Sequence, residues 1–442
     1  MKFEGIIFDM DGIILDSERY AVEIFKEIFA DLNKEFTEKI FKSVLGVTIE
    51  AENKILLDYF GREEDVLYFR EKYNLLMEKA YAEGKIPLKK GAYELINYLK
   101  EKNIPYALAT SSPLERVAVC FNNTKFGSNP FEYIVTGCEM ENSKPAPDIF
   151  LKAAELMNCD IKKCLVIEDS FNGIRAAHAS GATACMIIDI LPPTEELMEI
   201  IDVIKEDLFE VKRMIENSFL TEKQLASYFD HTNLKSFATE EDFKKLCQEA
   251  DDLGCSMVAI NSYPVKICKD YLKDSKVRVG AAISFPLGQT TIETKVQEIL
   301  NAIKDGVDEI DYVVNIGKVK EHNFDYIKEE MQQIVKVGRE NNILIKVIFE
   351  NCYLTDEEKI QLCHIAKEVK PDFIKTSTGF GTGGATLEDV RLMVREVNGT
   401  VKVKAAGGIR DLKTTLEFIE AGAQRIGTSS AVKIIEEFKE KN

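Results

Sequence analysis

The 442-residue sequence lacks any apolar stretch approaching the ~20 residues that a membrane-spanning helix needs. Long low-complexity tracts are also missing, and basic residues are outnumbered by acidic ones, 57 to 75, for a formal net charge of −18. That charge repels nucleic acids and anionic membranes, although local positive clefts for small phosphorylated substrates are compatible with it. The amino terminus runs straight into an apolar strand-like segment. We therefore expect a cytoplasmic protein with no nucleic-acid or membrane partner.

The ten cysteines lack the paired spacing of a zinc site. Reduced thiols are therefore favoured over a disulfide framework. Cys159 and Cys164 are the closest pair in the sequence, and their spacing is only weak evidence for a disulfide or a zinc site. Hydrophobic residues make up 45% of the chain and charged residues 30%, which is typical of a globular protein. A chain of this length predicts two domains of roughly 200 residues each.

In the second half, a lysine ends each of two successive predicted strands. Lys375 lies in the segment 372–376 before a small, hydroxyl-rich turn, and Lys404 lies in 401–405, one helix-sized segment later. A strand–helix–strand unit has parallel strands, which brings equivalent strand ends side by side. Two ammonium groups about 5 Å apart repel by roughly 3 kcal/mol at an effective dielectric constant of ~20, equivalent to about two pKa units.

This repulsion predicts that the pKa of one lysine falls toward ~8, where a useful fraction is free amine. A free amine attacks a carbonyl carbon to form a Schiff base. The alternative is a pair of ordinary surface lysines. Facing charges at the functional end of buried strands are uncommon, which favours the chemical interpretation.

Eight strand-like segments recur across the second half, separated by helical segments. They lie at 228–230, 256–260, 277–284, 309–314, 344–349, 372–376, 401–405 and 425–428. Eight such units over roughly 220 residues are typical of a (β/α)8 TIM barrel, whose chemistry lies at the C-terminal ends of the strands. Lys375 is then on strand six and Lys404 on strand seven.

Asp311 lies in the mostly apolar fourth strand. A buried carboxylate needs a partner, so it is a candidate to pair with a lysine and relay protons through water, with a structural ion pair as the alternative. Gly407 and Gly408 follow strand seven, and Ser429 and Ser430 follow strand eight. These turns occupy the usual barrel position for a phosphate, which binds backbone N–H groups and hydroxyls.

These segments, with 230–235 and 285–288, strongly resemble 2-deoxyribose-5-phosphate aldolases over about residues 220–436. The resemblance implies that Lys375 forms the Schiff base, that Lys404 lowers its pKa, and that Asp311 orders the proton-shuttling water. The implied reaction is reversible cleavage to acetaldehyde and glyceraldehyde 3-phosphate, which needs no metal or other cofactor.

Two further residues of the aldolase-like segments are assigned roles, and several others depart from the family pattern. Asp230 is a candidate for the same proton relay, whereas His231 is interpreted as structural. Some family members carry a lysine where Phe380 stands, which we interpret as a variation in the phosphate pocket and not as loss of catalysis. Differences at Ala259 and at 350–352 are candidates for altered substrate preference.

The first half opens on an apolar run, 3–8, that predicts a buried strand with Asp9 and Asp11 directly after it. In an extended chain, this spacing puts both carboxylates on one side, where they can share a divalent cation or divide the roles of nucleophile and acid or base. An acidic turn is the alternative. The residues 17–82 show helical periodicity, which indicates a helical insertion.

Polar residues also follow two further predicted strands of the first half. Thr110 and Ser111 end one strand, Glu168 and Asp169 end another, and Lys144 lies between them in sequence. Ligands of open α/β sheets bind outside the carboxyl ends of the strands. The set suits phosphate and magnesium.

These segments occur in the order of the four motifs of haloacid dehalogenase-like phosphotransferases, a resemblance over roughly residues 1–216. It implies an α/β fold with a doubly wound, Rossmann-like parallel sheet and a helical cap at about 17–82. It also implies that Asp9 accepts the phosphoryl group as an aspartyl phosphate and that Asp11 acts as general acid and base. The remaining implied roles are phosphoryl binding by Thr110, Ser111 and Lys144, and Mg²⁺ binding by Asp9, Asp11, Glu168 and Asp169.

The segment 16–18 further resembles the branch that contains β-phosphoglucomutase and small sugar phosphatases. The mutase holds a second phosphate with a cap arginine, and Ile49 stands at the matching place in 46–50. Lys54 and Arg19 are alternative cations, although such helix residues are usually solvated. A phosphatase, a mutase that makes deoxyribose 5-phosphate, and a non-catalytic phosphosugar-binding module therefore remain as hypotheses for this half.

A capping pattern at 217–222 opens a new helix, so we expect domains at 1–216 and 217–442. Together the two halves predict a bifunctional enzyme of deoxynucleoside or pentose catabolism that binds small phosphorylated sugars. Magnesium is expected in the first domain alone. A homodimer is one oligomeric state that the sequence leaves open.

Overall fold

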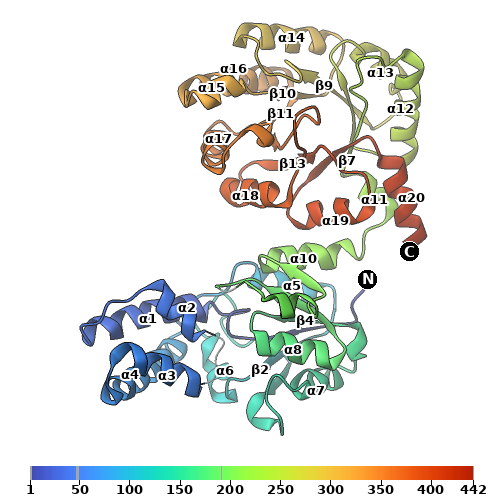
Figure 1. The fold of residues 1–442 in the computed structure, drawn as a ribbon. Coiled ribbons are helices and arrows are strands. Elements are labelled where there is room, and N and C mark those ends of the chain that lie inside the picture. The colour runs from blue at the N-terminus through green and yellow to red at the C-terminus, as the bar shows by residue number, and fades with distance from the viewer. Residues whose placement is uncertain (1, 46–48, 191, 442) are drawn as a thin grey trace. The chain divides into compact units, whose positions relative to one another are not determined.

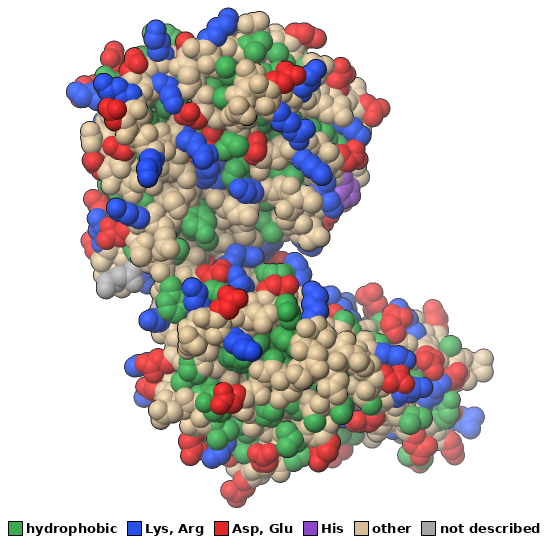
Figure 2. Space-filling view, turned by 180° about the vertical axis from the view of Figure 1, so that it is seen from behind, with side chains coloured by type: hydrophobic (Ala, Val, Ile, Leu, Met, Phe, Trp, Pro, Cys, Tyr) green, Lys and Arg blue, Asp and Glu red, His purple; other side chains and the backbone are tan. Residues whose placement is uncertain are grey.

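The computed structural model describes residues 2–45, 49–190 and 192–441, and the chain divides into two compact units, Met1–Ser218 and Phe219–Asn442 (Figure 1). Acidic and basic side chains are interspersed over the face of each unit seen in Figure 2. None of the described helices is both long and apolar enough to cross a membrane.

The first unit is built on a six-stranded sheet in the order β3-β2-β1-β4-β5-β6, and its neighbouring strands pair in parallel. The strands are β1 (Gly5–Phe8), β2 (Tyr106–Thr110), β3 (Tyr133–Thr136), β4 (Cys164–Glu168), β5 (Thr183–Ile187) and β6 (Val203–Lys205). The order reverses at β1, which lies between β2 and β4. In sheets of this kind, ligands bind where the strand order reverses.

Helices are distributed along the first unit as follows. Between β1 and β2 come α1 (Ser17–Asp31), α2 (Glu38–Val44), α3 (Ile49–Phe60), α4 (Glu63–Ala82) and α5 (Ala92–Glu101). The others are α6 (Leu114–Cys120), η1 (Gly137–Glu139), α7 (Asp148–Leu156), η2 (Ile161–Lys163), α8 (Phe171–Ser180), α9 (Glu195–Met198) and α10 (Leu208–Asn217). Ile6 and Phe8 of β1 pack into one hydrophobic cluster and Ile7 into another, so both faces of the sheet are covered.

The helices α1 to α4 have an aromatic core of their own. Phe25 and Phe29 lie on the buried face of α1. The ring centroid of Phe25 lies 4.8 Å from that of Phe69 on α4 and 4.9 Å from that of Phe41 on α2, and both pairs are edge-to-face. Such pairs add stability beyond the burial of their surface area.

The second unit is a closed parallel barrel in the order β10-β11-β12-β13-β14-β7-β8-β9. Its strands are β7 (Phe229–Thr232), β8 (Met257–Asn261), β9 (Arg278–Ile283), β10 (Glu309–Val313), β11 (Leu344–Ile348), β12 (Phe373–Lys375), β13 (Lys402–Ala406) and β14 (Arg425–Thr428). The pairing of β14 with β7 closes it. The predicted fold classes of both halves, a doubly wound sheet and a TIM barrel, are confirmed.

Helices surround the barrel (Figure 1). They are α11 (Glu222–Ala226), α12 (Glu240–Leu253), α13 (Val265–Tyr271), α14 (Ile292–Lys304), α15 (Ile316–Lys320), α16 (Phe324–Asn341), η3 (Asn351–Tyr353), α17 (Asp356–Val369), α18 (Leu387–Val397), α19 (Leu412–Glu420) and α20 (Ala431–Lys441). Local signals set their ends: Thr239 and Asp242 form a capping box at the start of α12, and Gly254 ends it with φ = 77°.

The two sides of each barrel strand have different chemistry. Ile310 and Tyr312 of β10 join the apolar cluster shared with the helices. Because successive side chains of a strand face opposite sides, Glu309 and Asp311 are left for the barrel interior. The parallel register sets Asp311 opposite Lys346 and Lys375 opposite Lys404. The predicted adjacency of the two lysines is confirmed.

We predict that Gly338→Ala destabilises the barrel, although alanine favours helix by about 1 kcal/mol over glycine. A Cβ at this buried position of α16 would lie 2.4 Å from Cγ1 of Ile345 and 2.9 Å from the backbone oxygen of Ile343. Overpacking of this kind costs about 1–3 kcal/mol, so the clash outweighs the helix preference. Urea denaturation followed by circular dichroism should show a lower midpoint, with the exposed Lys336→Ala as control. A higher midpoint for Gly338→Ala would contradict this.

Candidate active sites

Three buried lysines surround one carboxylate in the barrel interior. Oδ2 of Asp311 accepts hydrogen bonds from Nζ of Lys375 at 2.9 Å and from Nζ of Lys404 at 2.7 Å. Oδ1 of Asp311 accepts from Nζ of Lys346 at 2.8 Å. The side chains of Lys346 and Lys404 are fully buried, and that of Lys375 is 5% exposed. The alternative of two ordinary surface lysines is therefore wrong.

The environment of Lys375 favours its neutral amine. Burial lowers the pKa of Lys375 to about 8, Asp311 opposes this, and the charge of Lys404 lowers it further. The direction expected from the sequence is confirmed, but the main cause was wrong, because desolvation outweighs repulsion by Lys404. A neutral amine in this position can add to a carbonyl group.

Asp311 remains ionised in this setting. Burial alone would raise its pKa, but the ammonium groups of Lys346, Lys375 and Lys404 hold the pKa of Asp311 well below its usual range. A carboxylate bridging two amines can accept a proton from one and return it to the other.

A second set of buried charges supports this group. Asp230 on β7 pairs with Lys404 and accepts a hydrogen bond from Nη1 of Arg425 at 2.5 Å. Glu309 pairs with Lys346 and lies 3.4 Å from Nη2 of Arg425. Asp230, expected as part of the relay, is thus one contact away from Asp311 through Lys404.

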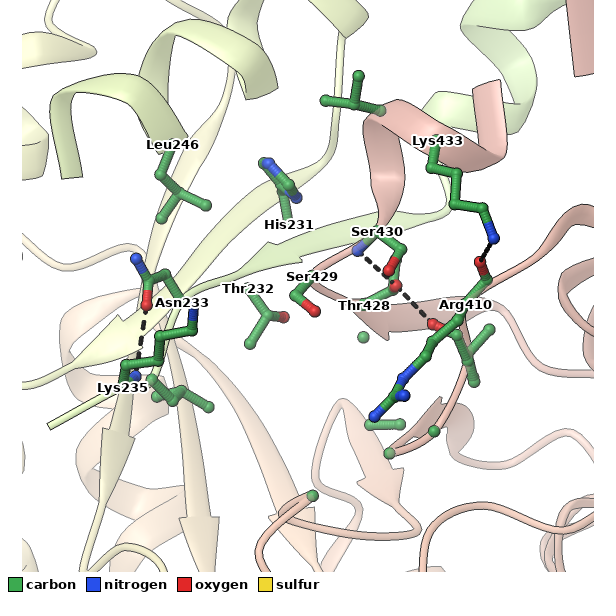
Figure 3. Close-up of a pocket in the computed structure, with 18 of the residues that line it drawn as sticks. His231, Thr232, Asn233, Lys235, Leu246, Arg410, Thr428, Ser429, Ser430 and Lys433 are labelled. Carbon is green, nitrogen blue, oxygen red and sulfur yellow. Dashed lines mark hydrogen bonds between the residues drawn. The ribbon is translucent and has the colours of Figure 1, made fainter. Parts of the chain in front are cut away.

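A cavity of about 660 Å³ opens above these charges, and Figure 3 shows part of its wall. Lys375 lines it together with the predicted phosphate residues Gly407, Gly408, Ser429 and Ser430, so the fold brings all of these together. Gly407 has φ = 92° and Gly408 φ = 83°, a left-handed conformation that favours glycine. Successive backbone N–H groups of such turns can bind an anion.

Phe380 and His231 line this cavity, and Glu350 contacts a residue that lines it. Phe380 is 56% exposed, and its ring centroid lies 5.3 Å from that of Phe285. Nε2 of His231 lies 2.8 Å from a carboxylate oxygen of Glu249 on α12. Glu350, with φ = 59°, accepts a hydrogen bond from the backbone N–H of Thr378, in the turn after Lys375.

In the first unit, a lysine bridges two carboxylates at the ends of β1 and β4. Nζ of Lys144 donates to Oδ1 of Asp9 at 2.5 Å and to Oε1 of Glu168 at 2.6 Å. Burial raises the pKa of Asp9 to about 7; Lys144 opposes this shift and Glu168 adds to it. The carboxylates outnumber the lysine, because Asp169 follows Glu168 directly.

The carboxylates of Asp9, Glu168 and Asp169 can each offer an oxygen within 4.8 Å of the others, which suits a hard divalent cation. Two glycines make room for them. A Cβ at Gly12 would lie 1.9 Å from Oδ2 of Asp169, and one at Gly173 would lie 1.9 Å from Cδ of Glu168. The donor set and the space around it fit the Mg²⁺ that the sequence implied.

Asp11 is not part of this carboxylate group. Its side chain accepts a hydrogen bond from Oγ of Ser112 at 2.9 Å and contacts the hydroxyl of Tyr81 on α4. The expectation that the side chains of Asp9 and Asp11 lie together on the cation is thus not met, because the chain turns after Asp9 and directs Asp11 toward α4. Thr110 is buried at the end of β2, whereas Ser111 beside it is exposed.

The mutase holds a second phosphate with a cap arginine; at the matching place stands Ile49, and the alternative cations named from the sequence are Lys54 and Arg19. Residues 46–48 lie outside the described part of the chain, and Ile49 is 69% exposed. Arg19 pairs with Asp189 at 3.5 Å and with Asp16 at 3.8 Å, and Lys54 is exposed. Glu18, Asp169 and Asp189 form a second acidic group, but Lys89 already lies 2.7 Å from Asp189.

Comparison with known proteins assigns both units. Residues 6–187 match the model of the haloacid dehalogenase-like hydrolases, and residues 224–436 match that of the DeoC/LacD family aldolases. The deoxyribose-phosphate aldolase of Thermococcus kodakarensis is 53% identical over 219 residues, which are 49% of this chain and 98% of that protein. The chain belongs to the DeoC/LacD aldolase family.

A second curated relative agrees with this assignment, and two solved structures are reported for comparison. The deoxyribose-phosphate aldolase of Lactobacillus acidophilus is 56% identical over 214 residues, covering 48% of this chain and 90% of that protein. Among solved structures, the tetrameric deoxyribose phosphate aldolase of Aeropyrum pernix is 30% identical (53% of this chain, 98% of that one; TM-score 0.49). A family IA hydrolase of Entamoeba histolytica is 26% identical (49% and 98%; TM-score 0.39). The chain is an enzyme, with a haloacid dehalogenase-like hydrolase domain preceding the aldolase barrel.

Sequence reasoning missed several members of both sites. In the aldolase barrel these are Lys346, Glu309 and Arg425, although each is a charged residue in a short predicted strand of the barrel. That pattern could have revealed them, because a charge in a buried strand needs a partner. In the hydrolase domain, Tyr81 had no comparable signal, whereas Ser112 ends the hydroxyl-rich run 110–112 after β2 but was assigned no role.

We predict that Gly173→Ala weakens Mg²⁺ binding to the hydrolase domain by about 10-fold or more, because the added methyl group displaces the carboxylate of Glu168. Isothermal titration calorimetry with MgCl₂ on the full chain measures the change. Asn172→Ala, at an exposed position on the same helix, is the matched control and should bind as the unaltered chain does. Equal Mg²⁺ affinities for the two variants would contradict the assignment of Glu168 to a cation site.

Proposed function

We propose that the barrel cleaves 2-deoxyribose 5-phosphate reversibly to acetaldehyde and glyceraldehyde 3-phosphate through a Schiff base on Lys375. The observation that carries this proposal is the buried amine of Lys375, hydrogen-bonded to Asp311 and facing a cavity that is also lined by the left-handed turn of Gly407 and Gly408. The names of relatives that are more than 50% identical to this barrel support the substrate.

The proposed chemistry uses the side chains around Lys375. Its neutral amine adds to C1 of the open-chain sugar, and loss of water leaves an iminium ion. The C3 hydroxyl gives up its proton, the C2–C3 bond breaks, and the electron pair moves toward the iminium nitrogen. Glyceraldehyde 3-phosphate leaves, C2 of the enamine is protonated, and hydrolysis releases acetaldehyde. Asp311 and Lys404 are the groups we assign to these proton transfers, directly or through water.

The phosphate of the substrate is assigned to the turns after β13 and β14. Backbone N–H groups at Gly407 and Gly408 and the hydroxyls of Ser429 and Ser430 are the proposed donors. Phe380 brings no charge, but the basic side chains of Lys235, Arg410 and Lys433 line the same cavity. They can balance a phosphate dianion.

For the first unit we propose a Mg²⁺-dependent phosphatase acting on small sugar phosphates. Asp9 would accept the phosphoryl group as an aspartyl phosphate, and Asp11 would serve as general acid and base. Thr110, Ser111 and Lys144 are assigned to the phosphoryl oxygens, and Asp9, Glu168 and Asp169 to the cation. Bound Mg²⁺ would lower the electrostatic cost of a phosphate dianion approaching a carboxylate.

A mutase that makes deoxyribose 5-phosphate is the second candidate for this unit. The fusion to an aldolase favours it, because the mutase product would be the aldolase substrate. The exposed, uncharged Ile49 argues against it, since a mutase must also hold a second phosphate. A non-catalytic phosphosugar-binding module is the third, and the intact acidic group with Lys144 argues against that role.

We predict that sodium borohydride added with 2-deoxyribose 5-phosphate attaches the substrate covalently to Lys375, as peptide mass spectrometry would show. Lys375→Ala should lose aldolase activity to background while retaining its far-UV circular dichroism. Full activity in that variant would rule out the proposed aldolase mechanism.

Aldolase activity should also depend on pH through this amine. Because the pKa of Lys375 is about 8, the reactive neutral form increases with pH up to that value. Below it, kcat/KM should fall by about 10-fold per pH unit toward pH 6 and level off above pH 8. A profile that keeps rising toward pH 10 would mean that the amine has the pKa of an ordinary lysine.

The role of the first unit can be decided by phosphorus NMR on the full chain carrying Lys375→Ala, which prevents consumption of the 5-phosphate. The sample contains MgCl₂ and deoxyribose 1-phosphate with a trace of the bisphosphate. We expect free phosphate, as for a phosphatase, and Asp9→Asn should abolish its release. A new 5-phosphate resonance would identify a mutase instead, and no turnover would favour a binding module.

A further inference from the structure

Lys346 lies at the centre of the barrel charges but does not line the cavity. It is fully buried on β11, directly opposite Asp311 in the strand register. Its Nζ pairs with Glu309, donates to Oδ1 of Asp311 at 2.8 Å, and lies 3.8 Å from Oδ2 of Asp230. A bound substrate would meet Lys375 first, so any effect of Lys346 on the chemistry passes through Asp311.

The charges of the interior are unequal in number. Among the described residues, the carboxylates that share these lysines and Arg425 are Asp230, Glu309 and Asp311, and the cations of the group are Lys346, Lys375, Lys404 and Arg425. Glu350 is also buried, but its carboxylate accepts hydrogen bonds from Thr378 and is not counted in this group. Four cations against three carboxylates leave one net positive charge. An uncompensated charge is costly away from water, and loss of one proton removes it.

The contacts indicate which lysine loses that proton. Among the described residues, Lys346 pairs closely with Glu309 and Asp311, and Lys404 pairs with Asp230 and Asp311. Lys375 pairs with Asp311 alone. Its charged form therefore has the least compensation of the three, and it is also the lysine that reaches the cavity.

We propose that Lys346 is a positioning residue for Lys375. By binding Oδ1 of Asp311, it holds that carboxylate so that Oδ2 faces both Lys375 and Lys404, and its positive charge keeps the Lys375 amine available in the neutral form. The inference rests on the proposed function of Lys375 as the Schiff-base lysine.

The neighbouring groups are consistent with a permanent charge on Lys346. Burial works against that charge, but Asp311, Glu309 and Asp230 raise the pKa of Lys346 above its ordinary value. Arg425 on β14 contacts Glu309 and Asp230 from the side of the barrel closure. Arg278 on β9 contacts Glu309 at 2.8 Å, but it is half exposed and therefore screened by water.

Two substitutions change the net charge of this interior in opposite directions. Lys346→Met removes a cation and leaves three of each sign, whereas Glu309→Gln removes a carboxylate and leaves four cations against two carboxylates. The double variant retains the original excess of one positive charge. Each can be followed, in the full chain, by the pH dependence of borohydride trapping at Lys375 with 2-deoxyribose 5-phosphate.

We expect Lys346→Met to raise the apparent pKa of trapping by about one unit, because a neighbouring positive charge has been removed. At pH 7 this lowers the trapping rate by about 10-fold. Glu309→Gln should lower the apparent pKa, and the double variant should return it close to the original value. Lys295→Met is the control, because Lys295 is equally buried but pairs with Glu330 outside this set of charges.

The outcomes separate the two hypotheses. No trapping at Lys375 in the unaltered chain would overturn the proposed function itself. If Lys346→Met is trapped with the same apparent pKa as the unaltered chain and Lys295→Met, only the role of Lys346 is overturned. The same conclusion would follow if Lys346→Met and Glu309→Gln shifted the apparent pKa of trapping in the same direction. If Lys346→Met does not fold, the other two variants test the role of Lys346. That role requires a lowered apparent pKa of trapping in Glu309→Gln and an apparent pKa close to the original value in the double variant.

Discussion

The barrel depends on the carboxylate of Asp311, which three lysines share away from water. TIM-barrel interiors are usually packed with branched apolar side chains, and charges there must compensate one another. Without Asp311, three ammonium groups would face one another in a medium of low dielectric constant. With it, the cations exceed the carboxylates by one, and the lysine with the fewest carboxylate contacts is the one whose pKa falls to about 8.

Both units contain a buried group of lysine and carboxylate side chains, but the sign of the excess charge differs between them. In each, lysine and carboxylates meet at or near the C-terminal ends of parallel strands. Carboxylates are in excess around Lys144, and the pKa of Asp9 rises to about 7, so the site has room for a positive ion. Cations are in excess around Asp311, so that site favours a neutral amine. The sign of the excess charge distinguishes a site suited to a divalent cation and a phosphoryl group from one suited to carbonyl chemistry at a neutral amine.

Much of this could be predicted from the sequence alone. The alternation of strands and helices determines a doubly wound sheet and a barrel, because a parallel strand must be followed by a crossover segment. The same rule places Asp9 with Glu168, and Lys375 with Lys404, since side chains at the ends of parallel strands meet at one edge. Glycine pairs such as Gly407 and Gly408 indicate a left-handed backbone conformation directly, so the turn that lines the cavity could also be predicted.

Only the tertiary structure decided which buried lysine, arginine and carboxylate side chains pair with one another. Closure of the barrel pairs β14 with β7 and so brings Arg425 into contact with Asp230, 195 residues earlier in the sequence. No local sequence pattern reveals such a contact. Lys346 and the cause of the lowered pKa of Lys375 likewise depend on burial and on distances between three strands. Asp11 contacts Tyr81 of α4 although the two residues lie 70 positions apart in the sequence. The sequence by itself therefore determined the two folds and the residues at the ends of neighbouring strands, such as Lys375 with Lys404. The further members of each site, and the protonation and pairing of all of them, were decided by desolvation and long-range geometry, which residue types and spacing do not encode.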